Sequence, residues 1–198
     1  MIKAIVFDMD GIVCIESERF SQRFSRDNNI PIEDVMKFFE RDFQSCLEGK
    51  ADLKISLTKY LKKWKCDKDI DEILDYWFSN GNVNKEIISL VKCLKKQNIM
   101  CMLCTNNEKY RVDYIRKKFD FDSLFDSIIT SFDVGAKKPD ARIFDRILEI
   151  ANVPAKYIIF CDDDEINIRA ARNHKFNTIF FKNTQQLKED IMDLGIQV

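Results

Sequence analysis

The sequence lacks several features that would assign it to a specialised class of protein. All its apolar runs fall far short of the about 20 residues of a membrane-spanning helix, and the N-terminal run stops at Asp8, too early for a secretory signal. There is no internal repeat and no low-complexity segment. Lysine and arginine (32) nearly balance aspartate and glutamate (33), so no net charge favours nucleic acid or an anionic membrane. We expect a soluble globular protein with neither of these partners.

Histidine and paired metal-binding cysteines are also scarce. His174 is the only histidine and lies outside every motif described below, so catalysis by histidine is not expected. The seven cysteines are an odd number scattered through apolar runs, which is typical of reduced thiols in the cytoplasm. Cys101 and Cys104 have the spacing of a metal or redox pair, but they lie in a strand-like run without a second Cys/His pair. We interpret them as core residues and expect a cytoplasmic protein.

What the sequence does contain is a series of short apolar runs that read as buried strands: residues 2–7, 99–104, 127–130, 157–161 and 178–181. The stretches between the later runs have helical periodicity, as at Ile143, Ile147 and Ala151. Strands that alternate with helices predict a parallel sheet with right-handed crossovers. The expected fold class is therefore α/β, a Rossmann-like parallel sheet with helices on both faces.

The first two runs are far apart, because one ends at residue 7 and the next begins at residue 99. Residues 14–80 contain no convincing strand but several helical stripes of large apolar side chains, in which Pro31 fits a first helical turn and Asp52 an N-cap. We predict a helical cap over residues 14–81 with its own core, inserted into a Rossmann-like core formed by residues 1–13 and 82–198. Gly11 and Gly81 bracket the insertion and are suited to hinges.

Asp8 and Asp10 directly follow the first run, and open α/β sheets bind ligands beyond the carboxyl ends of their strands. If strand pairing persists that far, the two carboxylates point to the same side, about 6.5–7 Å apart. One carboxylate could then attack a small electrophile while the other handles the proton of the leaving group. An Asx-type turn that closes the strand is the alternative interpretation.

Two polar clusters follow later strands. Thr105 and Asn106 come after the second run, where a hydroxyl and free N–H groups at a helix start form an anion site, although N-capping by an asparagine fits equally well. Lys138 and Pro139 come after the third run. Pro139 fits the first turn of the next helix and keeps Lys138 extended, so that its ammonium can pair with both the carboxylates and a phosphate.

A third cluster, Asp162, Asp163 and Asp164, follows the fourth run and begins a helix. The helix dipole alone would stabilise acidic residues there. Beside Asp8 and Asp10, however, they would concentrate negative charge unless a cation lies among them. Carboxylates, a carbonyl and water are the oxygen ligands that Mg²⁺ prefers. We therefore predict that Mg²⁺ binds among these carboxylates, beyond the ends of the strands.

In this order, the four motifs resemble those of the haloacid dehalogenase-like (HAD) hydrolase superfamily, over nearly the full chain. The helical insertion resembles that superfamily's C1 cap, and residues 135–140 and 162–167 are similar to the branch of α-glucose-1-phosphate phosphatase-like proteins. The resemblance implies a Mg²⁺-dependent phosphatase, monomeric or weakly dimeric, acting on a small phosphorylated metabolite such as a sugar phosphate. A phosphomutase of the β-phosphoglucomutase type and a non-catalytic HAD-fold binding module are the alternatives.

The resemblance also implies a role for each acidic residue. Asp8 would be the nucleophile that forms an aspartyl-phosphate, and Asp10 would protonate the leaving oxygen and then activate water. Asp8, the Asp10 carbonyl and Asp163 would hold Mg²⁺, with Asp162 as a direct or water-mediated partner. Dehalogenases resemble the first motif without its second aspartate, so Asp10 favours phosphoryl chemistry.

The remaining roles concern the phosphate and the substrate. Thr105 and the Asn106 N–H would bind phosphoryl oxygens, and Lys138 would offset their charge. Asn167 would orient the metal ligands. Lys50 lies between two helical stripes of the cap, at a position similar to the substrate-specificity loop, and is the candidate for substrate recognition there; a solvated lysine is the alternative.

Overall fold

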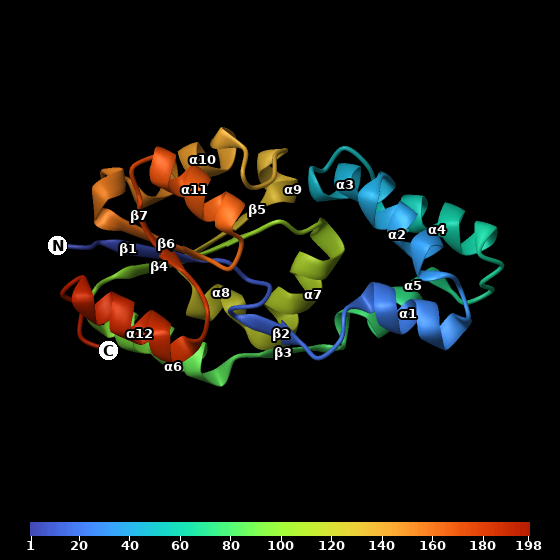
Figure 1. The fold of residues 1–198 in the computed structure, drawn as a ribbon, viewed down its shortest axis with the longest axis horizontal. Helices are drawn as coiled ribbons and strands as arrows, with labels where there is room; N and C mark the ends of the chain where they lie inside the picture. The colour runs from blue at the N-terminus through green and yellow to red at the C-terminus, as the bar shows by residue number, and fades with distance from the viewer.

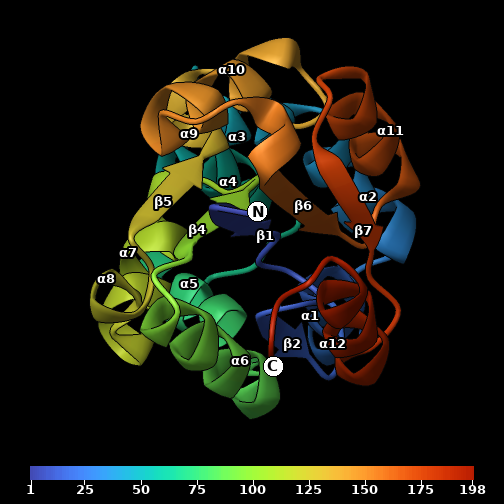
Figure 2. The same cartoon turned by 90° about the vertical axis from the view of Figure 1, so that its left-hand side faces the viewer.

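The computed structural model describes all 198 residues, and a five-stranded parallel sheet lies at its centre. The strand order is β5-β4-β1-β6-β7 (Figures 1 and 2). The strands are β1 (Ala4–Phe7), β4 (Met100–Thr105), β5 (Ser127–Thr130), β6 (Ile158–Asp162) and β7 (Asn177–Phe180). β1 is buried along its whole length because helices cover both faces of the sheet, which explains its uninterrupted apolar sequence. All five predicted strands and the predicted α/β fold are confirmed.

Helices lie on both faces of this sheet (Figure 2). One face is covered by α9 (Ser131–Val134), α10 (Ala141–Ala151) and α11 (Glu165–Asn173), and the other by α6 (Lys85–Lys96), α7 (Lys109–Phe119), α8 (Phe121–Leu124) and α12 (Thr184–Asp193). A short 3-10 helix, η1 (Ala155–Tyr157), precedes β6. Cys101 and Cys104 belong to the apolar clusters on opposite faces, so they are core residues and not a pair. None of the helices combines the length and the apolar character needed to cross a membrane.

A third apolar cluster lies outside the sheet, among α1 (Phe20–Asn28), α2 (Ile32–Glu40), α3 (Asp42–Leu47), α4 (Leu53–Lys63) and α5 (Ile70–Phe78). Figure 1 shows these helices as a group at one end of the molecule. Aromatic rings fill the cluster; those of Phe20 and Trp77 stack with their centroids 4.4 Å apart. Asp52 caps α4 as predicted, because its side chain accepts a hydrogen bond from the Ile55 N–H at 3.2 Å. Pro31 is the N-cap of α2 and lies just before its first turn.

Two short strands join this helical group to the sheet. β2 (Cys14–Glu16) and β3 (Gly81–Val83) pair antiparallel, and we call them the ribbon. The prediction that residues 14–80 contain no strand was therefore wrong. Three-residue strands are too short to show an alternating pattern, and this pair forms only because the two ends of the insertion meet in space. The ribbon holds the two connections together.

The helical group also contacts the core beside α7. The Asp52 carboxylate accepts a hydrogen bond from the Tyr110 hydroxyl at 2.7 Å and lies 3.1 Å from the Lys109 ammonium. Near the ribbon, the Lys118 ammonium donates to the carbonyls of Ser79 and Gly81 at 3.2 and 3.3 Å. The helical group therefore rests on the same edge of the sheet that carries the polar motifs.

Candidate active site

The strand register brings the polar motifs together. Phe7 of β1 lies level with Leu103 of β4 and with Cys161 of β6, so the three strands end at the same edge of the sheet. The Asp8 N–H still donates to the Cys161 carbonyl at 2.9 Å, which places Asp8 next to Asp162. Beyond this point the chain turns, and strand pairing does not persist to Asp10 as the 6.5–7 Å estimate required.

A cavity of about 490 Å³ opens at this edge, and 11 of its 13 lining residues are not hydrophobic. The sheet edge contributes five of the predicted site residues: Asp8, Asp10, Asn106, Lys138 and Asp163. Asn167 of α11 also reaches it. Thr105 and Asp162 are buried just behind the lining. The structure thus brings together every predicted site residue of the core.

Lys138 is the centre of this cluster. Its ammonium lies 2.7 Å from Asp8 Oδ1 and 2.7 Å from Asp162 Oδ2, and it donates to the Cys104 carbonyl at 3.2 Å. The side chain is only 2% exposed. Burial lowers the pKa of Lys138, but Asp8 and Asp162 outweigh it and hold that pKa well above its usual range. Lys138 is therefore a permanent cation between two carboxylates.

The carboxylates still carry more negative charge than this one cation offsets. Burial raises the pKa of Asp8 to about 7; Lys138 opposes the shift, while Asp162 and Asp10 add to it. Burial, followed by the charge of Asp162, also raises the pKa of Asp163. Asp8, Asp162 and Asp163 each offer an oxygen within 4.8 Å of the others. The donor set and the excess charge fit a divalent cation that prefers oxygen ligands.

Gly11 lies against the same acidic cluster and has no room for a side chain. Its backbone has φ +83°, and a Cβ placed there would lie 2.4 Å from Asp163 Oδ2. Any side chain would therefore displace the Asp163 carboxylate. The interpretation of Gly11 as a hinge does not include this requirement: the loops that carry Gly11 and Asp163 approach each other so closely that only glycine fits.

Hydrogen bonds fix the positions of Thr105, Asn106 and Lys138, the residues predicted to bind phosphate. The Asn106 side chain accepts a hydrogen bond from the Lys138 N–H at 2.7 Å and donates to the Lys138 carbonyl at 3.0 Å. The Thr105 hydroxyl accepts from Asn107 Nδ2 at 2.7 Å. The alternative that an asparagine caps α7 is wrong, because Glu108 is the N-cap. Asn106 instead fixes the backbone of Lys138.

The helices α10 and α11 begin slightly differently from the prediction. Pro139 was expected in the first turn of α10, but that helix begins at Ala141 with Asp140 as its N-cap, so Pro139 lies before it. Asp164 is the N-cap of α11 and accepts from the Ile166 N–H at 2.8 Å. The helix-start interpretation of the acidic triplet therefore holds for Asp164, while Asp162 and Asp163 face the cluster.

Lys50 is not among the residues that line this cavity. Its side chain is 63% exposed and pairs with Glu48. It lines a separate cavity of about 240 Å³ between the helical group and the core, together with Asp52 and Lys109. From the insertion, the side chains that reach the Asp8 cavity are those of the β2 segment and of Arg19, at the start of α1.

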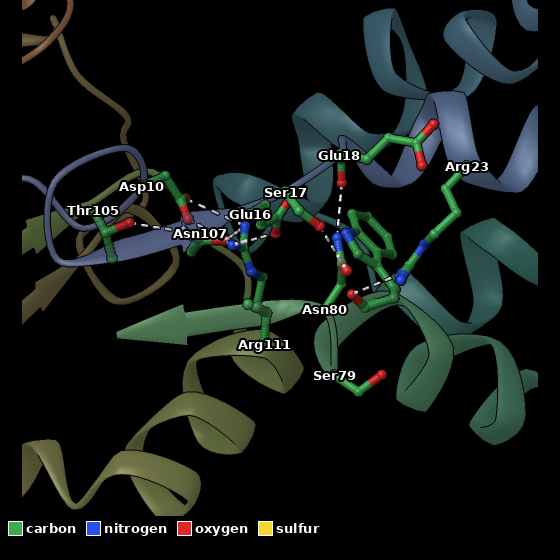
Figure 3. A network of polar contacts seen from close by, with 12 residues as sticks. Asp10, Glu16, Ser17, Glu18, Arg23, Ser79, Asn80, Thr105, Asn107 and Arg111 are labelled. Carbon is green, nitrogen blue, oxygen red and sulfur yellow. Dashed lines mark hydrogen bonds and ion pairs between the residues drawn. The ribbon is translucent and has the colours of Figure 1, made fainter. Parts of the chain in front are cut away.

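Sequence reasoning also missed Arg111 of α7. Its guanidinium pairs with Asp10 Oδ1 at 2.5 Å and with Glu16 Oε1 at 2.9 Å, as Figure 3 shows. The side chain is only 13% exposed. Nothing in the sequence distinguishes Arg111 from the other basic residues of α7, because its partners lie about a hundred positions earlier.

Known structures share this fold. A predicted HAD-like hydrolase from Porphyromonas gingivalis superposes with a TM-score of 0.82 at 19% identity, covering 100% of both chains. A HAD-family enzyme from Bacteroides thetaiotaomicron, in complex with magnesium and inorganic phosphate, superposes with a TM-score of 0.79 at 20% identity, covering 92% of this chain and 95% of that one. At such identities the likeness establishes the fold.

Curated relatives and a family model extend the comparison. The chain is 23% identical over 206 residues to bifunctional epoxide hydrolase 2 of Rattus norvegicus, covering 92% of this chain but only 37% of that protein. It is 21% identical over 189 residues to a phosphorylated carbohydrates phosphatase of Thermotoga maritima, covering 90% and 84%. The model of the haloacid dehalogenase-like hydrolases matches residues 5–181. With the sheet, the ordered motifs and their shared cavity, this match shows that the chain belongs to the haloacid dehalogenase-like hydrolase family.

Proposed function

We propose that this hydrolase is a magnesium-dependent phosphatase that acts on a small phosphorylated metabolite through an aspartyl-phosphate on Asp8. One observation carries the proposal. Asp8 is paired with a buried cation, Lys138, and both line a polar cavity that also contains a second carboxylate, Asp10. A nucleophilic carboxylate and a nearby acid–base carboxylate are the two groups that the transfer and hydrolysis of a phosphoryl group require.

The acidic cluster is suited to Mg²⁺. Asp163, at the cavity, and Asp8 would hold the ion, together with the Asp10 carbonyl that the family resemblance implies. Both oxygens of Asp162 already accept hydrogen bonds, Oδ2 from Lys138 and Oδ1 from Asn167 and the Asp164 N–H, which favours contact through water. When bound, the ion would neutralise charge on the phosphoryl oxygens. The magnesium and phosphate in the Bacteroides thetaiotaomicron enzyme support this assignment.

The chemistry assigned to the chain's own residues has two steps. Asp8 Oδ1 is already held by the Met9 N–H at 2.7 Å and by Lys138, which leaves Oδ2 for the attack. Oδ2 bonds to phosphorus, the bond from phosphorus to the leaving oxygen breaks, and Asp10 gives its proton to that oxygen. Water then attacks the phosphorus and gives a proton to Asp10, so that phosphate is released and Asp8 is regenerated. Lys138 offsets the charge of Asp8 throughout.

The cavity and its surroundings support a small phosphorylated metabolite as the substrate class. A cavity of about 490 Å³ with a mostly polar lining suits a small hydrophilic molecule. The near-zero net charge gives no attraction to polyanions. The phosphorylated carbohydrates phosphatase of Thermotoga maritima makes sugar phosphates the first substrates to test.

We further propose that the helical group acts as a cap that opens and closes over this cavity. The ribbon pairs Cys14, from the insertion, with Val83, so the mobile joints would lie beyond it, near Ser17 and Asn80. Closure would bring Arg19 toward a bound substrate and exclude water. Hydrogen exchange at these joints should slow when a phosphate-mimicking fluoride–metal complex binds, and exchange that stays unchanged with the complex bound would contradict a moving cap.

The decisive experiment measures phosphate release by the purified chain from an aryl phosphate and a panel of sugar phosphates, with Mg²⁺ or with EDTA. We expect activity only with Mg²⁺, and a loss of at least about a thousandfold in Asp8→Asn. Asp145→Asn, an exposed change on α10, is the matched control and should retain full activity. Full activity in Asp8→Asn would overturn the assigned nucleophile, and activity in EDTA would overturn the metal.

A further inference from the structure

Asp10, the proposed acid–base group, is clamped by residues of α7 and of the loop before it. Arg111 approaches both oxygens of its carboxylate, with Nη2 at 2.5 Å from Oδ1 and Nη1 at 3.3 Å from Oδ2. Asn107 Nδ2 donates to Oδ2 at 2.8 Å. Arg111 Nη1 in turn donates to Asn107 Oδ1 at 3.2 Å, so the two side chains support each other (Figure 3). A carboxylate held at both oxygens has a fixed orientation.

The same guanidinium also binds the ribbon. Arg111 Nη2 lies 2.9 Å from Glu16 Oε1, and Glu16 is the last residue of β2. Just beyond it, the joint to the helical group is tied across, because Asn80 Nδ2 donates to the Glu18 carbonyl at 2.8 Å. Figure 3 shows two groups of contacts, one around Arg111 and one around Asn80, which the backbone between Glu16 and Ser17 joins. One core residue thus contacts the catalytic loop and the base of the proposed cap.

We propose that Arg111 is a positioning residue: it orients Asp10 toward the leaving oxygen and, through Glu16, couples that orientation to the ribbon that carries the cap. The proposal rests on the phosphatase function proposed above. Without Arg111, the carboxylates of Asp10 and Glu16 share no cation and repel each other. Asn107 alone then holds Asp10, and a displacement of about 1 Å can cost a hundredfold in rate.

This role predicts that the damage depends on the leaving group. An alkyl or sugar phosphate releases a basic oxygen that needs a proton from Asp10, whereas p-nitrophenyl phosphate releases a stable anion that does not. A residue that only maintains the fold or binds phosphate would affect both substrates equally. Single-turnover release of the leaving group isolates this step from the later attack of water.

The experiment compares Arg111→Gln and Arg111→Lys with the wild type on a sugar phosphate and on p-nitrophenyl phosphate, in single turnover with Mg²⁺. We expect about a 10- to 100-fold slower release from the sugar phosphate, and a change within about threefold on p-nitrophenyl phosphate. Asp10→Asn should show the same selectivity with a larger loss, and adding Arg111→Gln to it should cost little more. Arg116→Gln, an exposed change on the same helix, is the control and should leave both rates unchanged.

Glu16→Gln tests the coupling separately, because it leaves the Arg111–Asp10 pair in place and should fold even if the Arg111 variants do not. We expect a smaller loss, again confined to the sugar phosphate. Equal losses on both substrates in Arg111→Gln would overturn the positioning role, and wild-type rates in Glu16→Gln would overturn the coupling. Failure of the phosphatase proposal is distinct, since the wild type would then hydrolyse neither substrate.

Discussion

The two walls of the active-site cavity are built differently. The core wall is centred on Asp8 and Lys138, whose side chains are almost completely buried, and the register of neighbouring strands in the sheet places Asp8. The opposite wall comes from β2 and from Arg19, carried by a ribbon of two three-residue strands. Ile15 on that wall is 46% exposed. The core wall holds Asp8 and Lys138 in place through the sheet, whereas the ribbon wall is joined to the core by fewer contacts, among them the ion pair of Glu16 with Arg111.

The largest effect should come from removing the cation of the core wall. Lys138→Met leaves Asp8 and Asp162 facing each other without compensation, and breaking such a buried pair typically costs about 3–5 kcal/mol. We expect that loss in the free energy of unfolding, measured by urea denaturation in EDTA. Lys137→Met, on the adjacent and more exposed lysine, should cost under about 1 kcal/mol. Equal losses in the two variants would show that the ion pairs of Lys138 do not stabilise the core wall.

The burial of Asp8 in the core wall should also make the stability of the protein depend on pH. In the metal-free protein, burial raises the pKa of Asp8 from 3.8 to about 7, so the folded state binds this proton more tightly than the unfolded state. The stabilising proton is fully present below about pH 4 and is lost as the pH rises through about 7. The wild type should therefore lose stability relative to Asp8→Asn over this range, by up to about 1 kcal/mol per pH unit. Parallel profiles from urea titrations in EDTA would contradict a raised pKa of Asp8 in the folded protein.

A pair of glycine variants separates backbone strain from damage to the metal ligands. Gly11 and Gly195 both have φ +83°, but only a Cβ at Gly11 would meet Asp163 Oδ2, at 2.4 Å. Both alanine variants should lose about 1–2 kcal/mol of stability through the backbone. Only Gly11→Ala should also weaken Mg²⁺ binding, by about tenfold or more, in calorimetric titrations. Unaltered Mg²⁺ affinity in Gly11→Ala would place Asp163 outside the metal site.

The smallest effect is expected in a comparison of Arg19 and Lys50, which tests which part of the insertion contacts the substrate. Arg19 lines the Asp8 cavity, whereas Lys50 lines a separate one. We expect Arg19→Ala to lower kcat/KM for a sugar phosphate by about 1 kcal/mol, roughly fivefold, and Lys50→Ala to lower it by less. An aryl phosphate too small to reach the ribbon wall is the control substrate. A larger loss of kcat/KM in Lys50→Ala than in Arg19→Ala would assign substrate recognition to the loop that carries Lys50.

The core wall was predictable from the sequence because its residues are fixed by local rules. A polar cluster that follows an apolar strand in a parallel sheet must emerge at the carboxyl edge, and this places Asp8, Asn106, Lys138 and Asp163 without knowledge of any distance. The helical stripes of the insertion were equally visible, since a period of 3.6 residues repeats over several turns. The details that the sequence missed here lie just beyond strand ends and at helix starts, where strand pairing stops before Asp10 and Pro139 lies before α10.

The ribbon wall could not be predicted in this way. β2 and β3 are too short to carry a pattern and exist only because distant segments pair, Cys14 with Val83. Arg111 gains its place from two carboxylates that reach it across the fold, and its own neighbours in α7 give no sign of them. Periodicity and strand ends were enough to predict the sheet, the order of its motifs and the carboxylates that meet at its edge. The partners that hold Asp10, and the residues of the insertion that reach the cavity, emerge only in the folded chain, because they depend on contacts between segments far apart in the sequence.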